Sequence, residues 1–152
     1  MLRLLLPLVC LFLCLTCQPK PSGGVNQVNA KEQAMASTIP TPSAWRIVSC
    51  ASGGKTIEAV NDKGFIAIRD GQIGGHTGCN SFGGDWTGSA AKMKVGGVMS
   101  TKMYCEDAAA QENMVIGMLN GTVAAKVSGK TLTLTGNKTT VTLQRDDALL
   151  KL

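Results

Sequence analysis

The 152-residue sequence has few charged residues, few aromatic residues and a single histidine. Charged residues make up 16% of the chain, which is below the roughly 25% of an average globular protein, and the formal net charge is only +5. Because the basic residues are dispersed along the chain, this composition argues against a nucleic-acid-binding protein. The single histidine, His76, excludes a metal site built from several imidazoles and any mechanism that needs a histidine pair.

Motifs of the common enzyme classes are missing as well. The sequence contains no Gly-x-Ser-x-Gly motif, Walker loop, dinucleotide fingerprint or His-Glu-x-x-His motif. We therefore predict no catalytic residues, no metal and no cofactor. One alternative stays open, a thiol-dependent enzyme in which Cys79 is the nucleophile and His76 the base, although the two residues lie only three positions apart across an expected turn.

The N-terminus has the pattern of an export signal. Arg3 precedes the apolar run Leu4–Thr16, which is shorter than the ~18 residues needed to span a bilayer, so residues 1–16 are predicted to be a secretory signal peptide. Cys17 follows directly, where a bacterial lipoprotein carries its acylated cysteine, although the three residues before it depart from the usual lipobox. We expect a monomer exported to the cell envelope, in the periplasm or at the outer membrane, and held by a lipid on Cys17. The alternative is a soluble exported form.

The rest of the chain divides into three parts. Residues 17–43 hold four of the five prolines among Ser, Gly, Asn and Gln, a composition that predicts a flexible tether. Residues 44–146 show short apolar runs separated by Gly-rich turns, which is typical of an antiparallel β domain. Residues 147–152 are left as a C-terminal tail.

Period-two alternation and turn residues predict nine strands and one helix. The helix is expected over Glu106–Asn120, because Ala108, Gln111, Val115, Met118 and Leu119 recur at helical spacing after two acidic residues. It is amphipathic and should cover an edge or an end of the sheet. The predicted strands are Trp45–Cys50, Thr56–Val60, Phe65–Arg69, Gln72–Thr77, Phe82–Thr87, Ala91–Val95, Val123–Val127, Thr131–Thr135 and Thr139–Arg145.

The cysteines outside the leader favour a disulfide, because an exported protein folds where disulfides persist. A bridge between Cys79 and Cys105 would close a 27-residue loop and contribute about 3–4 kcal/mol in the chain-entropy model. Cys50 would then be a small buried residue or a spare thiol. The Gly-rich run around Cys79 predicts a bulge or corner rather than a phosphate-binding loop, because no helix start follows it.

Three runs carry a resemblance to a known family. They are Gly78–Trp86, Ser100–Cys105 and Gly129–Leu134, together with Trp45 and Glu112. In this combination they resemble the META domain family of HslJ-like proteins over about residues 44–146. The matching positions are Trp45, Gly78, Cys79, Asn80, Phe82, Gly84, Trp86, Thr101, Met103, Cys105 and Glu112.

The resemblance implies a fold and a cellular setting. The expected fold is α+β and mainly β, a small antiparallel barrel or half-barrel with one helix, and the implied disulfide is Cys79–Cys105. The family also implies a secreted or envelope lipoprotein connected with envelope stress and tolerance of toxic compounds. We therefore expect a non-enzymatic module that binds an envelope protein or a small apolar ligand. A chaperone-like or inhibitory subunit is a further alternative.

Overall fold

The structure is a computed structural model that describes residues 38–151. The expected signal peptide, Cys17 and most of the expected tether lie outside these residues. The described chain begins within the tether interval, where Ile39 and Ser43 are buried. No helix in this part of the chain has the length and apolar character needed to cross a membrane.

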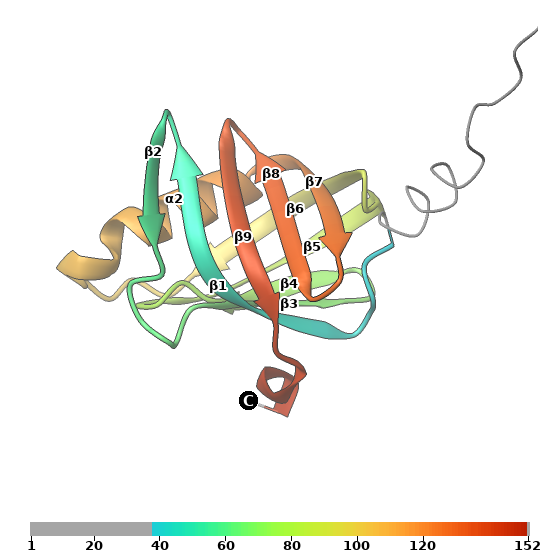
Figure 1. Cartoon of the computed structure of the whole chain (residues 1–152), viewed down its shortest axis with the longest axis horizontal. Coiled ribbons are helices and arrows are strands. Elements are labelled where there is room, and N and C mark those ends of the chain that lie inside the picture. Colours follow the sequence, from blue (N-terminus) through green and yellow to red (C-terminus); the bar gives the residue numbers. More distant parts are fainter. Residues whose placement is uncertain (1–37, 152) are drawn as a thin grey trace, which may run out of the picture.

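The described residues form an antiparallel β-barrel with one helix, as the sequence predicts (Figure 1). Eight strands close the barrel because β1 pairs with both β3 and β9, while β2 adds a short hairpin arm to β1. The strands are β1 (Ser43–Ser52), β2 (Lys55–Glu58), β3 (Phe65–Arg69), β4 (Gln72–His76), β5 (Ser81–Ser89), β6 (Lys92–Ser100), β7 (Gly121–Ser128), β8 (Thr131–Gly136) and β9 (Thr139–Arg145).

The barrel interior is filled by one side-chain row from each strand. Leu132 and Leu134 of β8 are fully buried, and Ile66 and Ile68 of β3 behave in the same way, as alternation predicts. Burial of each such side chain contributes about 1.5–3 kcal/mol. Trp45 of β1 is also fully buried, and its indole N–H donates to the Ser43 hydroxyl at 2.7 Å.

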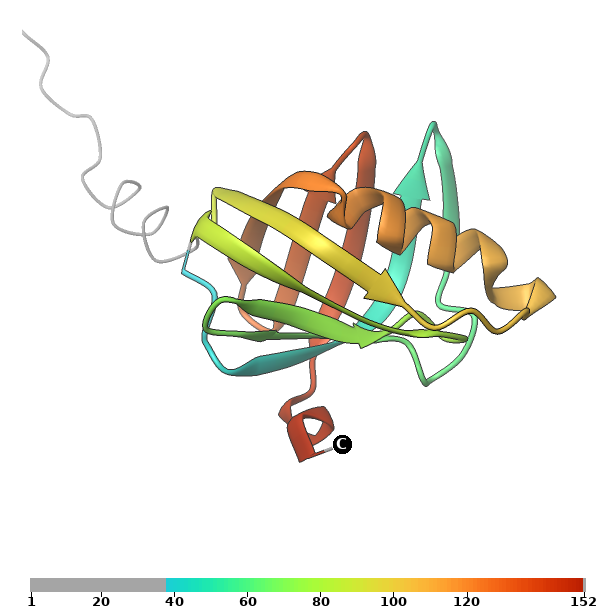
Figure 2. The same ribbon diagram turned by 180° about the vertical axis from the view of Figure 1, so that it is seen from behind.

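One helix covers an end of the barrel (Figure 2). Helix α2 (Ala109–Leu119) follows the 3-10 turn η1 (Glu106–Ala108), so the predicted helix is present but its first turn is 3-10. The residues predicted to face inward, from Ala108 to Leu119 at helical spacing, are the buried ones. They pack against β1 and β6 to β9, because the helix crosses the barrel opening.

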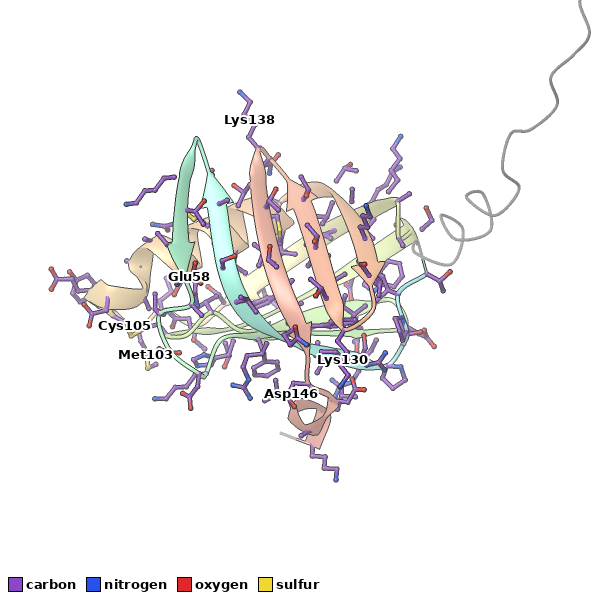
Figure 3. The ribbon with its side chains drawn as sticks, in the orientation of Figure 1. Glu58, Met103, Cys105, Lys130, Lys138 and Asp146 are labelled. Carbon is purple, nitrogen blue, oxygen red and sulfur yellow. A yellow bond between two sulfur atoms is a disulfide. The ribbon has the colours of Figure 1, made fainter. Side chains whose placement is uncertain are left out.

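The C-terminal residues form a second 3-10 segment, η2 (Asp147–Lys151), against β1 and β3. The Asp147 carboxylate accepts the Ala44 N–H at 3.2 Å and pairs with Arg145 at 2.8 Å. Asp146 pairs with Arg46 at 2.8 Å and lies between η2 and the barrel (Figure 3). These contacts hold the tail to the domain.

Strand β6 is longer than the sequence predicts. Alternation ends at Val95, but the strand continues through a bulge to Ser100, where two residues of β6 lie opposite Gly84 of β5. Gly97 occupies the left-handed region at φ 61°, which a bulge of this kind favours. β7 pairs only with Met93–Val95, so the second half of β6 has β5 as its one described strand neighbour.

Candidate functional site

The Gly-rich run forms a tight corner between β4 and β5. The Thr77 N–H donates to the Asn80 carbonyl at 2.8 Å, and the Asn80 N–H donates to the Thr77 hydroxyl at 3.1 Å. Gly78 sits inside this corner at φ 102°, a conformation that glycine adopts without strain. The run is therefore the corner that the sequence predicts.

The Asn80 side chain continues the β-sheet pairing just before the first residue of β5. Its Oδ1 accepts the Met103 N–H at 2.7 Å and the Thr101 hydroxyl at 2.8 Å, while its Nδ2 donates to the Met103 carbonyl at 3.0 Å. The side-chain amide thus bonds both backbone groups of Met103, as the next residue of a strand would. The segment after β6 stays extended for this reason.

The same corner is joined to the helix. Asn80 Nδ2 donates to the Glu112 carboxylate at 2.8 Å, and the Thr77 hydroxyl donates to it at 3.1 Å. Gln111 accepts the Val60 N–H at 3.1 Å and donates to the Thr77 carbonyl. Asn80, Thr77 and Gln111 are buried, and every buried side-chain polar atom of the described residues has a partner. The network therefore has the hydrogen-bond completeness of a structural core.

A disulfide joins Cys79 to Cys105, the pair implied by the family resemblance. It links the corner to the residue before η1, and Figure 3 shows Cys105 beside Met103 at the end of the molecule where the helix begins. Both cross-links, the covalent one and the Asn80 network, fix the segment between β6 and α2.

The thiol and imidazole groups that the sequence singles out are held by local contacts. His76 Nδ1 accepts the Gly78 N–H at 3.0 Å, and burial is the main factor that lowers the pKa of His76 below 6.5, with Lys63 adding to the shift. Burial raises the pKa of the Cys50 thiol to about 11. The sulfur of Cys79 is bonded to that of Cys105, so the proposed Cys79–His76 pair has no thiolate in this state.

The remaining motif residues have packing roles. Trp45 and Phe82 belong to the core, and Trp86 donates its indole N–H to the Arg69 carbonyl at 2.9 Å. At Gly84 a side chain would begin 2.9 Å from the Gly96 carbonyl oxygen, so β5 and β6 approach too closely for a larger residue. No cluster of three or more potential metal ligands occurs among residues 38–151.

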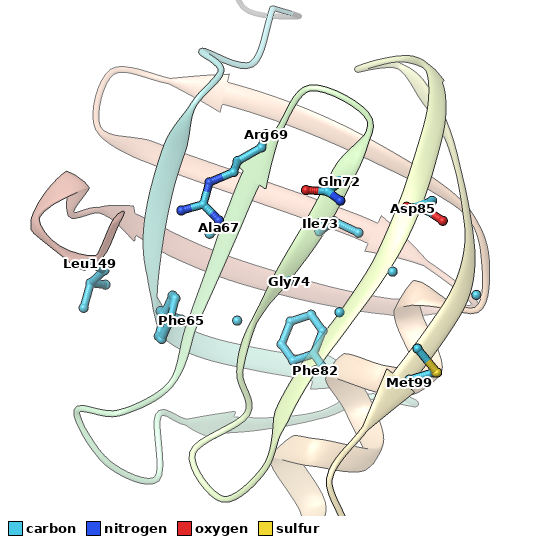
Figure 4. A pocket seen from close by; sticks show the side chains of 14 residues that line it. Phe65, Ala67, Arg69, Gln72, Ile73, Gly74, Phe82, Asp85, Met99 and Leu149 are labelled. Atoms are coloured by element: carbon cyan, nitrogen blue, oxygen red, sulfur yellow. The ribbon is translucent and has the colours of Figure 1, made fainter. Parts of the chain in front are cut away.

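A trough of about 450 Å³ lies on the outer face of β3 to β6 (Figure 4). Strand register places Ala67, Gly74, Gly83 and Met99 in one row across these four strands. The first three form a floor without large side chains, and nothing lies within 4 Å of the position where a Gly83 Cβ would point. Apolar walls come from Phe65, Met99 and Leu149, while Phe82 belongs to the inward-facing row of Ile66 and borders the trough from below.

One end of the trough is polar. Arg69, Gln72 and Asp85 lie opposite one another on β3, β4 and β5, and all three side chains line the trough (Figure 4). Neither Arg69 nor Asp85 has an ion-pair partner among the described residues. Sequence reasoning missed this site, because these residues become neighbours only through the register of three strands.

Comparisons with known proteins identify the fold. The family model of the META domain matches residues 26–148. An NMR structure of a protein with 23% sequence identity aligns with a TM-score of 0.56 over 74% of this chain and 94% of its own. An NMR structure of a protein from Burkholderia xenovorans, with 15% identity, aligns with a TM-score of 0.57 over 76% of this chain and 87% of its own. No curated protein matches the sequence.

Proposed function

Because the chain belongs to the META domain family, we propose that it is an exported, lipid-anchored monomer that binds a small ligand in the outer trough and catalyses no reaction. Members of the family are commonly exported, and the Cys79–Cys105 disulfide fits an oxidising compartment. The lipid anchor on Cys17 is supported by the apolar leader and the polar run that follows it.

The trough is the observation that carries the binding proposal. Its volume of about 450 Å³ falls within the range of about 300–1,000 Å³ typical of ligand sites. Glycine backbone forms much of the floor, so a flat apolar body can lie against it between Phe65 and Met99. At the polar end, Arg69 on β3 can pair with an anionic group on the ligand, because Gln72 on β4 separates Arg69 from the Asp85 carboxylate on β5. The expected ligand is therefore a flat apolar molecule with an acidic substituent.

A fluorescent probe of this chemistry tests the trough. Anilinonaphthalene sulfonate combines a flat apolar body with one anionic group, and we expect it to bind the wild-type chain. Gly83→Val places a branched side chain in the open trough and should weaken binding at least tenfold. Gly96→Val is the matched control, because it introduces the same side chain on the neighbouring strand, also into open space, but beside Asp85 at the rim of the trough rather than on its floor.

The two variants also separate binding from folding. A Gly→Val change at an open strand position should stabilise the domain by roughly 0.5–1 kcal/mol or leave it unchanged. Equal probe affinity in wild type, Gly83→Val and Gly96→Val would refute the trough as the site. Arg69→Gln should weaken the anionic probe while leaving the thermal midpoint near that of the wild type.

The anchor and the physiological role are tested in cells. Mass spectrometry of the mature protein should find a diacylglyceryl group on Cys17, and unmodified Cys17 or cleavage elsewhere would contradict the anchor. Envelope stress tolerance is proposed to depend on ligand capture, so Gly83→Val should fail to restore survival of a deletion strain exposed to a toxic compound, whereas Gly96→Val should restore it.

A further inference from the structure

Two of the strand edges that lack a neighbour in the described chain differ in character. The edge of β2 is four residues long and carries the exposed charges of Lys55 and Glu58, which discourage pairing with another strand. The second edge is Gly96–Ser100 of β6, on the side away from β5. It is longer and has no such protection.

At the end of this second edge and just after it, the backbone groups of alternate residues point away from β5. The Thr101 N–H donates to the Ser81 carbonyl at 3.0 Å, and Met103 bonds the Asn80 side chain through both backbone groups, so both residues face β5. Because successive residues of an extended strand direct these groups to opposite sides, the N–H and C=O groups of Ser100 and Lys102 face away from β5. They form a short ladder available to another strand.

A groove runs along this ladder. Its volume is about 420 Å³, and its two walls are the segment from Ser100 to Tyr104 and the α2 residues Glu112, Asn113 and Ile116. An edge strand facing a helix across a groove is the arrangement in which an extended peptide can add to a sheet while its side chains contact the helix. Met103, which lines the groove, lies beside Cys105 at the end of the molecule where the helix begins (Figure 3).

Apolar side chains are exposed along the same segment. Four large apolar residues of the described chain are exposed, and three of them are Met99 at 78%, Met103 at 61% and Tyr104 at 86%. Single exposed apolar residues are ordinary, but three within six positions beside an open strand edge mark an interaction surface. Methionine side chains also adapt to different partner side chains.

The charges indicate what kind of segment fits. Lys102 lines the groove and has no ion-pair partner among the described residues, whereas the Glu112 carboxylate already accepts hydrogen bonds from Thr77 and Asn80. We propose that the edge of β6 binds an extended segment of a partner polypeptide, with alternating apolar and acidic residues, as an additional antiparallel or parallel strand beside α2. This surface adjoins the small-ligand trough, with which it shares Met99, but the proposed strand pairing does not depend on ligand binding in the trough.

The test uses peptides as the probe and one edge position as the reporter. The purified chain is used to select binders from a phage-displayed library of random twelve-residue peptides, and selected peptides are synthesised. We expect sequences with alternating apolar and acidic residues. Ser100→Pro removes the outward N–H without removing a hydrogen bond to β5, so affinity should fall at least tenfold, while Ser100→Ala keeps the N–H and should bind as the wild type does.

Two measurements make the result specific to strand addition. Binding should protect the Ser100 amide from hydrogen exchange. Two peptide series, N-methylated at the odd-numbered or at the even-numbered amides, should differ in affinity. The series that blocks the amides facing β6 should bind more weakly, and the other should bind as the unmethylated peptide does. The methylation series uses only the wild-type chain, so it decides the question even where Ser100→Pro fails to fold. Retention of anilinonaphthalene sulfonate binding by Ser100→Pro would show that the trough is intact.

Several results would overturn the proposal. These are recovery of no peptide, equal affinity for Ser100→Pro and Ser100→Ala, or binding without protection of the Ser100 amide. Protection of this amide that rises with protein concentration in the absence of peptide would assign the edge to a second copy of the chain instead. Lys102→Glu should weaken acidic peptides at least tenfold, and an unchanged affinity would refute the charge preference.

Discussion

The most informative single substitution is Asn80→Ala. It removes the side chain that bonds Thr101, both backbone groups of Met103 and the carboxylate of Glu112, at distances of 2.7 to 3.0 Å. Asn80 itself is 1% exposed. The substitution therefore deletes these four hydrogen bonds at a buried position, together with a long one from Asn80 Nδ2 to Cys79 Sγ at 3.6 Å, while the disulfide itself stays covalently intact.

The expected loss follows from these contacts. A neutral hydrogen bond contributes about 1 kcal/mol net, and one to a charged group about 1.5–3 kcal/mol. Because Met103 is 61% exposed, its freed backbone groups can bond water, which offsets part of the loss. We expect the free energy of unfolding to fall by about 2–4 kcal/mol, equivalent to a decrease in Tm of roughly 8–16 °C for a domain of this size.

Urea and thermal unfolding with the disulfide intact measure this change. Asn113→Ala is the control, because Asn113 is exposed on α2, and the change should alter the free energy of unfolding by no more than about 0.5 kcal/mol. Hydrogen exchange should accelerate at Met103 more than in β8, since the network acts locally. A loss below about 1 kcal/mol, or one equal to that of the control, would refute the ladder-extending role of Asn80.

Two further predictions concern titratable groups. In the mature protein with Cys17 acylated, no thiol should react with an alkylating reagent in the native state, because burial raises the pKa of Cys50 to about 11. After unfolding, one thiol should react. A thiol that reacts in the native state would revive the enzyme alternative. The side-chain hydrogen bond from Arg145, followed by that from the Ala44 N–H, lowers the pKa of Asp147 below 3.8. This contribution to stability is therefore present above pH 3.8 and lost as the pH falls below it, so the Ala44 amide resonance should shift below pH 3.8 in the wild type and stay constant in Asp147→Asn.

Local pattern was sufficient to predict the elements of the fold. Alternation places a strand at each of the nine observed positions, with Phe65–Arg69 and Thr139–Arg145 at their observed bounds, and helical spacing identifies the buried face of α2. Both signals depend on residues two to four positions apart. Several strands are longer than predicted, and the largest difference at one end is in β6, because a bulge at Gly97 interrupts the alternation on which the prediction depends.

Contacts between residues far apart in the sequence could not be predicted from this local pattern. Barrel closure depends on the pairing of β1 with β9, and the trough depends on a register that aligns Arg69 with Asp85 across β4. Asn80 is recognisable as part of a motif, but its role requires Met103 to lie beside it, 23 positions along the chain. A single sequence contains no signal for such register, because each strand's pattern fits several pairings.

Most residues that line the two proposed binding surfaces lie outside the set of positions that identify the family. Asn80, Thr101, Glu112 and the disulfide form the corner that holds the segment after β6 extended, and they are bonded to one another. A segment fixed in this way loses little conformational entropy when a peptide pairs with it, so the corner pre-organises the edge for the partner. The trough and the groove are lined mainly by residues outside the motif, such as Arg69, which leaves ligand preference free to change while the fold is kept.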